Sequence, residues 1–159
     1  MNGVVTTGTM APAKPKSGRT FSITGYQTTV PIPVALVSAS AALGNKRLTG
    51  TATSIVDATG ATPKSIQIAK KKYSVPIPKK IPTTGVVIAM PESPMAVGPF
   101  KAATSKITVS VDPHLTLTLV VSGSPLTMRC LAYPNKTFPT GITTKKPKGT
   151  PISPVIASS

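Results

Sequence analysis

The chain has 159 residues and a single cysteine, so it has the length of one domain and cannot form an intrachain disulfide framework. Its 18 prolines exclude long helices, whereas its many Thr, Ser, Val and Ile residues favour strands, because β-branched side chains pack well on a pleated sheet. Eighteen Lys and Arg residues against three acidic ones give a formal net charge of +15, which is far from that of an ordinary soluble domain.

The two ends of the chain differ from its middle. Residues 1–19 are basic, contain small residues and show no apolar period, which predicts a flexible basic arm with order beginning near Thr20. Residues 143–159 are rich in proline and lysine and predict an extended, Pro-rich tail. Residues 20–142 are left as the β domain. The start of the chain does not read as a signal peptide, and no apolar run of about 20 residues predicts a transmembrane segment.

The first predicted strands lie at residues 21–30, 34–43 and 47–56. The alanines of the second run also allow a short helix, but prolines just before it and glycine just after it favour a strand. Gly44-Asn45 is typical of a two-residue turn, which predicts a β-hairpin between the second and third runs.

Further strands are predicted at residues 65–69, 73–77, 86–90 and 105–111. From residue 105 onward apolar and polar residues alternate through three successive runs, separated by Asp112-Pro113-His114 and by a Ser-Gly-Ser-Pro turn. We therefore expect a three-stranded antiparallel meander over residues 105–132.

These runs predict an all-β fold with at least seven strands within residues 20–135. Short strands at roughly ten-residue spacing with Pro and Gly turns favour an antiparallel β-sandwich of Greek-key, immunoglobulin-like type, or a partly open barrel. The alternation predicts a single core containing Ile107, Val109, Val111, Leu115, Leu117, Leu119, Leu126 and Met128.

Candidate catalytic groups are few. A zinc site requires about four Cys or His ligands, the chain has two, and it contains no Gly-rich phosphate loop, so we expect no metal or cofactor. Asp112 and His114 flank a proline and are expected to serve a turn rather than a catalytic triad. Cys130 falls on the apolar face of its strand, where a thiol stays protonated and inert. The sequence therefore predicts a protein that is not an enzyme.

The remaining chemistry is positive charge. Most of the basic residues are lysines and aromatic residues are scarce, so we do not expect contacts that read a nucleic-acid sequence. We do expect sequence-independent binding to a polyanion. Such a partner would be nucleic acid, teichoic acid or a sulfated glycan. One basic cluster, Lys14, Lys16 and Arg19, falls in the predicted flexible arm. The candidate binding residues are those of the other clusters: Lys46, Arg47, Lys70, Lys71, Lys72, Lys79, Lys80, Lys145, Lys146 and Lys148.

The segment VDPHLTLTLVVSGSPLTMRCLAYPNKTFPTGI, residues 111–142, resembles the C-terminal part of a group of uncharacterised secreted proteins of actinobacteria. In that group, Thr/Val/Pro-rich β domains end in a Cys-containing strand followed by a Pro-Thr-Gly turn. The resemblance implies an exported, cell-envelope β-sandwich without an assigned activity. Proteins of the group often pair the cysteine equivalent to Cys130 with another one, which this chain lacks.

Two hypotheses of different class follow. The first is a non-enzymatic structural or adhesive module of a cell envelope, appendage or virion-like assembly, which would be secreted and would associate with copies of itself. The second is a polyanion-binding protein. Lysines also stand where the resemblance suits Thr or Ser, as at Lys106, so deliberate cationic engineering of the surface is an alternative origin of the charge.

Overall fold

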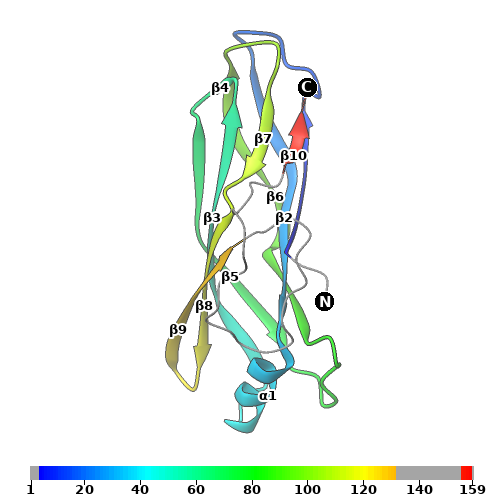
Figure 1. Ribbon diagram of the computed structural model, residues 1–159, viewed down its shortest axis with the longest axis vertical. Coiled ribbons are helices and arrows are strands. Elements are labelled where there is room, and N and C mark those ends of the chain that lie inside the picture. Colours follow the sequence, from blue (N-terminus) through cyan, green and yellow to red (C-terminus); the bar gives the residue numbers. More distant parts are fainter. Residues whose placement is uncertain (1–3, 132–154, 159) are drawn as a thin grey trace.

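The computed structural model describes residues 4–131 and 155–158. Two antiparallel β-sheets face each other in an elongated sandwich, with one short helix at the lower end in Figure 1. The predicted all-β antiparallel sandwich is therefore confirmed. The elements in chain order are β1 (Val5–Ala11), β2 (Thr20–Ile32), α1 (Val34–Ala42), β3 (Arg47–Thr59), β4 (Ala61–Thr62), β5 (Ser65–Pro76), β6 (Val86–Ala102), β7 (Thr108–Val111), β8 (His114–Val121), β9 (Ser124–Leu131) and β10 (Val155–Ser158).

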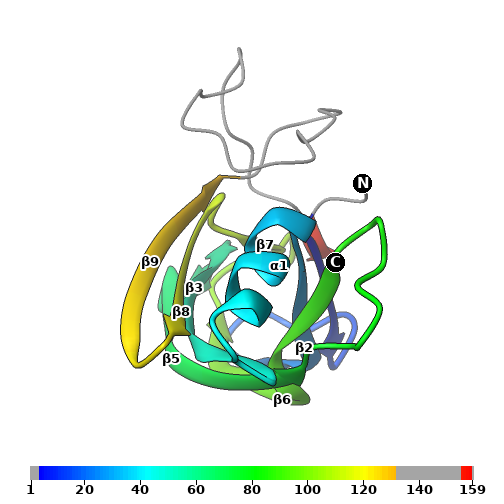
Figure 2. The same ribbon diagram turned by 90° about the horizontal axis from the view of Figure 1, so that it is seen from below.

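The two sheets share a simple alternation of strand direction. One sheet has the order β1-β2-β6-β4. In the other, β3 pairs with β5 along one edge and with β7 and β8 along the opposite edge, while β9 pairs with β8 and β10 with β7. Seen along the long axis, the sheets curl around a common interior, and α1 lies across its lower opening (Figure 2). Because neighbouring strands are antiparallel, alternate turns meet at the same end of the sandwich.

The interior contains two buried clusters rather than one core. The cluster away from α1 includes Phe21 and Phe100, whose stacked rings have centroids 5.4 Å apart. The cluster beside α1 includes Leu36 and Val37 of that helix. Six of the predicted core residues are buried and divide between the two clusters: Ile107, Val109 and Val111 in the first, and Leu115, Leu117 and Leu119 in the second.

The core prediction was wrong for two residues of β9. Leu126 is 43% exposed and Met128 is only partly buried, although both lie opposite buried leucines of β8. In the described part of the chain β9 is the last strand on its side of the sheet, so its inner face is covered less completely than that of β8. Alternation predicted the correct face but not the depth of burial.

Residues 34–42 form the helix α1 and not the predicted strand. Pro33 occupies the N-cap, where the lack of an N–H is harmless, and Leu36, Val37 and Ser40 turn to the interior at helical spacing. Gly44 has a φ of 80° and its N–H donates to the carbonyl oxygen of Ala41, so it ends the helix instead of closing the predicted hairpin with Asn45. No helix among the described residues has the length and apolar character needed to span a membrane.

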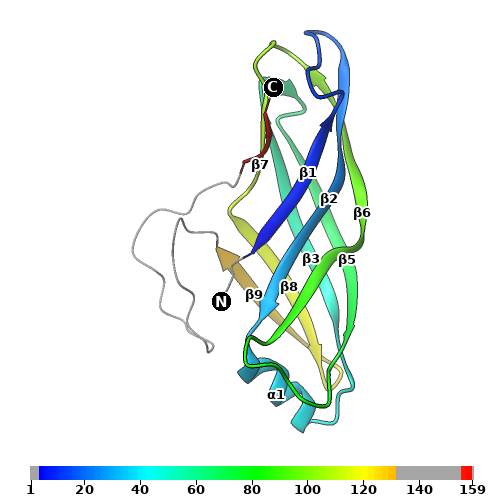
Figure 3. The same cartoon turned by 90° about the vertical axis from the view of Figure 1, so that its right-hand side faces the viewer.

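The predicted basic arm contains a strand. Residues 5–11 form β1, which runs antiparallel to β2 along most of its length (Figure 3). Only Met10 of this strand is buried, and side-chain hydrogen bonds such as the 2.9 Å bond between Thr6 Oγ1 and Thr28 Oγ1 join the strand to β2. A single buried apolar residue leaves no period in the sequence, so the backbone ladder that holds β1 was not foreseen. In the predicted tail, Val155–Ser158 forms β10 and the rest lies outside the described residues.

The predicted meander over residues 105–132 is correct only for its second half. β8 and β9 form a hairpin around Ser122 and Gly123, which both have positive φ as a two-residue turn requires. In contrast, β7 pairs with residues 56–59 of β3, and β8 pairs with residues 49–53 of the same strand. Thus β7 and β8 lie end to end along β3, and Asp112-Pro113-His114 interrupts one edge of the ladder without reversing the chain.

Candidate polyanion-binding surface

Four of the predicted basic residues gather at the end of the sandwich that carries α1. Arg47 begins β3 opposite Pro76, and the N–H of Ile77 donates to the carbonyl oxygen of Lys46 at 2.9 Å. Lys79 and Lys80 follow in the turn after β5. We name Lys46, Arg47, Lys79 and Lys80 the helix-end group, and all four are exposed. Lys145, Lys146 and Lys148 lie outside the described residues.

The guanidinium of Arg47 is already engaged by β5. Its Nε donates to Ser74 Oγ at 2.7 Å, and its Nη2 donates to the Ser74 carbonyl oxygen at 2.8 Å. The carboxylate of Glu92 accepts a hydrogen bond from the N–H of the same serine. A carboxylate and an arginine are therefore both bound to Ser74, which reduces the free positive charge at this end.

The three consecutive lysines of β5 do not form one patch. The register between β3 and β5 shifts at Lys70, whose φ is 46° and whose N–H donates to Thr53 Oγ1 at 3.1 Å. This bulge directs Lys71 toward the interior, on the same face as buried Tyr73, while Lys72 stays exposed. An inward-pointing charge on an edge strand opposes pairing with another chain. Sequence adjacency was therefore misleading for these residues.

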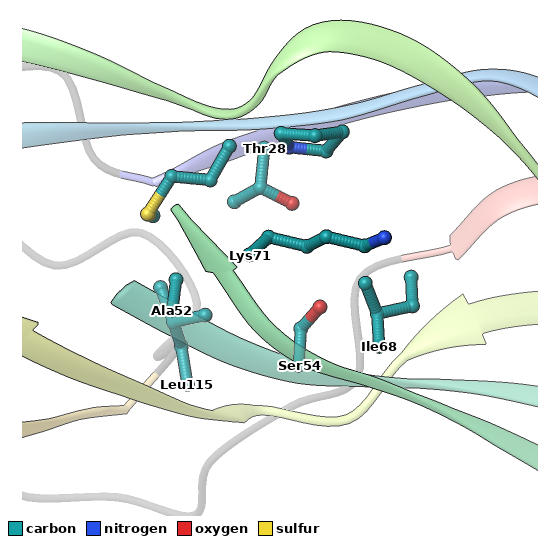
Figure 4. A pocket seen from close by; sticks show the side chains of 8 residues that line it. Thr28, Ala52, Ser54, Ile68, Lys71 and Leu115 are labelled. Carbon is teal, nitrogen blue, oxygen red and sulfur yellow. The ribbon is translucent and has the colours of Figure 1, made fainter. Parts of the chain in front are cut away.

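Lys71 borders two hollows between β5 and β6. In the first, its side chain extends between Thr28 and Ser54 (Figure 4), but the cavity volume is about 10 Å³, roughly that of one water molecule. The second, lined by Ile66 and Met95 among others, measures about 180 Å³. Both are smaller than typical pockets for small ligands, which measure roughly 300–1,000 Å³. Neither hollow is a candidate site for a small molecule.

A larger group of cations lies at the opposite end of the sandwich. The three turns that meet there join β1 to β2, β4 to β5, and β6 to β7 (Figure 1). Backbone hydrogen bonds fix these turns to one another or to the strands beside them. Gly18 N–H donates to the Ala102 carbonyl oxygen, Ala103 N–H to the carbonyl oxygen of Gly60 between β3 and β4, and Ala58 N–H of β3 to the Lys64 carbonyl oxygen, each at 2.8 Å. Six exposed basic residues belong to these turns or the strand ends beside them, and we name them the loop-end group: Lys14, Lys16, Arg19, Lys64, Lys101 and Lys106.

Sequence reasoning did not place the loop-end group among the candidate residues. Lys64, Lys101 and Lys106 each stand alone in the sequence, and Lys14, Lys16 and Arg19 were assigned to a flexible arm. The pattern that could have revealed the group is the alternation of strand direction, since every second turn of an antiparallel sandwich lies at the same end. That inference requires β1 and the length of β6, which the sequence did not show.

The acidic residues form no salt bridge with a Lys or Arg of the described residues. Among the described residues the only ion pair joins His114 Nδ1 to Asp112 Oδ1 at 2.8 Å, and no Lys or Arg takes part in a salt bridge. Glu92 is engaged by Ser74. Burial raises the pKa of the Asp57 carboxyl, and the nearby Asp112 carboxylate raises it further. Three acids, of which only Glu92 lies beside a bound cation, therefore leave most of the basic surface without a neutralising carboxylate.

The Asp112–His114 pair serves the chain locally. Asp112 Oδ1 also accepts the backbone N–H of His114 at 2.8 Å, and the imidazole is 67% exposed in the break between β7 and β8. Among the hydrogen bonds of the described residues, those of the His114 imidazole and N–H are to Asp112 and none is to a hydroxyl group. In the same part of the chain, His, Cys, Asp and Glu form no group of three that could hold a metal ion.

Cys130 is partly buried on β9 opposite Leu115, next to the cluster that contains Tyr73. Burial raises the pKa of the Cys130 thiol. Burial, with a smaller contribution from Cys130, also raises the pKa of the Tyr73 phenol to about 12. Both groups therefore stay protonated at neutral pH.

We expect the Cys130 thiol to react with iodoacetamide at pH 7 more slowly in the folded protein than in the same chain unfolded in denaturant. The thiolate is the reactive form, and burial both suppresses it and restricts access. Mass spectrometry of time points measures the rate, which should rise with pH. Equal rates for folded and unfolded chain would contradict the burial of this side chain.

Comparison with known proteins identifies no relative: neither a protein-family model, nor a curated protein, nor a solved structure matches this chain.

Proposed function

We propose that this chain is a non-enzymatic adhesive or structural β-sandwich module of a cell envelope, appendage or virion-like assembly, and that its adhesive ligand is an anionic polymer. The observation that carries the proposal is that no Lys or Arg of the described residues forms a salt bridge with a carboxylate. Basic residues also far outnumber acidic ones in the sequence. Cations without internal partners are free to replace the counterions that condense on a polyanion, and the released counterions drive binding.

The strand order supports the modular part of the proposal. The sheet β1-β2-β6 opposes a sheet in which β5, β3, β8 and β9 are successive neighbours. In immunoglobulin-like domains the first, second and fifth strands share one sheet, and the third pairs with the sixth in the other. Many cell-surface modules use such sandwiches, which supports an exported, envelope-associated location. Electron microscopy over a range of concentrations tests the self-association expected of an assembly module.

The aromatic residues support binding that does not depend on sequence. All four aromatic side chains of the described residues, Phe21, Tyr26, Tyr73 and Phe100, are at most 2% exposed. Base stacking requires exposed aromatic rings, and base readout favours Arg with its two parallel donors, whereas this surface is mostly lysine. The backbone charge of the polymer is therefore the feature that this protein can recognise.

We expect the protein to bind heparin and duplex DNA with micromolar affinity at about physiological ionic strength, where scattered charges are largely screened from one another. The logarithm of the affinity for duplex should fall linearly with the logarithm of salt concentration, by roughly 0.9 per phosphate contact. Fluorescence anisotropy with labelled duplex measures both, and a scrambled duplex should compete equally well. Loss of all binding at that ionic strength would contradict the proposal and leave the lysines as a solubilising coat.

A further inference from the structure

We propose that the loop-end group is the polyanion site, and that its partner is a flexible, linear phosphate polymer gripped by the end of the sandwich. This inference rests on the proposed function and names its site and ligand class. It concerns Lys14, Lys16, Arg19, Lys64, Lys101 and Lys106, which three separate turns bring to one end of the molecule.

The backbone of the loop end is held in place by hydrogen bonds, which join the β1–β2 turn to the β6–β7 turn and the β4–β5 turn to β3. Besides the three backbone bonds given above, Ser17 Oγ donates to the Ala103 carbonyl oxygen at 3.2 Å, and the N–H of Ala102 donates to the Arg19 carbonyl oxygen at 2.9 Å. Thr104 Oγ1 closes the third turn on itself by donating to the Lys106 carbonyl oxygen at 2.7 Å. Cations on turns held in this way are presented together, so less conformational entropy is lost when a polymer binds.

The charge balance distinguishes the loop end from the helix end. Residues 12–19, 60–64 and 101–107 contain no Asp or Glu. The carboxylate beside these turns is that of Asp57, which is partly buried on β3 opposite Ser65, so six exposed cations stand near one acid. The helix-end group has four cations, and one of them, Arg47, is held at Ser74 together with the Glu92 carboxylate. The positive potential is therefore expected to be strongest at the loop end.

The composition of the loop end selects the kind of polymer. Five of its six cations are lysines, which bind phosphate as point charges without a fixed bidentate geometry, and none of the exposed large apolar residues of the described chain lies on these turns. These turns therefore offer no exposed large apolar side chain that could insert into a lipid surface. The turns occupy the narrow end of an elongated molecule (Figure 3). A stiff duplex, with a persistence length of about 150 bp, touches such an end tangentially, whereas a flexible chain can bend around all three turns.

The decisive experiment compares two variants that each lose three lysine charges. The loop-end variant carries Lys16→Gln, Lys64→Gln and Lys106→Gln, one from each turn, and the control carries Lys46→Gln, Lys79→Gln and Lys80→Gln. All six side chains are exposed, so both variants should unfold at the temperature of the wild type. The probe is fluorescent inorganic polyphosphate at about physiological ionic strength, titrated over a range of salt concentrations.

We expect the loop-end variant to bind polyphosphate at least about tenfold more weakly than the wild type, and its log–log salt slope to be shallower by about 2, because each contact with a single chain contributes about 0.7. The control variant should keep the wild-type slope. At equal concentration of phosphate groups, unlabelled polyphosphate should displace the fluorescent polyphosphate better than duplex DNA does. Anionic phosphatidylserine vesicles should not compete as well as polyphosphate.

Three results would contradict different parts of the proposal: the site, the class of ligand, and the proposed function itself. Equal losses in the two variants would overturn the loop-end site while leaving polyanion binding intact. Stronger competition by duplex, by vesicles or by heparin of equal charge would overturn the choice of a flexible phosphate chain. A wild type that binds neither polyphosphate, heparin nor duplex at this ionic strength would overturn the proposed function together with the site.

Discussion

Replacing Leu119 with alanine is expected to lower the free energy of unfolding by about 3 kcal/mol, because the substitution removes a fully buried side chain and leaves a cavity. Leu119 lies on β8 with no exposed surface and belongs to the cluster beside α1. The neighbouring strand β3 places Gly50 opposite it, so no large side chain of that residue is available to fill the space. Equilibrium unfolding in urea, followed by far-UV circular dichroism, measures the loss.

Leu126→Ala is the matched control for this prediction. Leu126 is the cross-strand partner of Leu119 on β9 and points to the same face, but it is 43% exposed. Its truncation should cost less than about 1 kcal/mol, since much of its surface is already in water. A loss as large as that of Leu119→Ala would show that β9 is covered in solution and would contradict the exposure in the structure.

Replacing Gly50 with alanine is expected to destabilise the fold by about 3 kcal/mol or more, which is the upper part of the range for overpacking. A Cβ at this position would lie 1.9 Å from the carbonyl oxygen of Thr118 and 2.5 Å from Tyr73 Oη. The Tyr73 hydroxyl donates to that same carbonyl at 3.1 Å, so the tyrosine ring covers the glycine and bonds across it to β8. One added methyl group therefore opposes both the pairing of β3 with β8 and the Tyr73 hydrogen bond.

Gly123→Ala separates this clash from the general cost of replacing a glycine. Gly123 has a φ of 80° in the β8–β9 turn, and nothing lies within 4 Å of a Cβ built there. Alanine in that left-handed conformation should cost about 1 kcal/mol. Thermal unfolding of the two variants side by side measures the difference. If Gly50→Ala were no more destabilising than Gly123→Ala, the close packing of Tyr73 over β3 would be wrong.

Much of the secondary structure could be predicted from local patterns, and the errors have a common cause. The long strands around residues 21–30 and 47–56 were foreseen because β-branched residues dominate them. The segment at residues 34–42 was misassigned because its flanking prolines suit a helix start as well as a strand edge. The residues of segment 34–42 thus allowed either a helix or a strand, and the contacts of Leu36 and Val37 with distant strands of the core selected the helix.

The candidate site shows the same division. Runs of lysine are visible in the sequence, and four of those residues do gather beside α1. The run Lys70 to Lys72 is divided by a β-bulge, since the register shift against β3 turns Lys71 inward. The loop-end group consists partly of cations that are isolated in sequence, and only the antiparallel pairing of β1, β2, β6 and β4 brings their turns to one end.

The sequence by itself determined the fold class, the excess of positive charge and, through period-two alternation, the face to which the side chains of β7, β8 and β9 point. The tertiary structure alone decided that β7 and β8 lie end to end along β3, that Leu126 is exposed while Leu119 is buried, and which cations are neighbours. The physical reason is that alternation is a property of a single strand, whereas pairing, burial and charge clustering depend on partners far away in the chain.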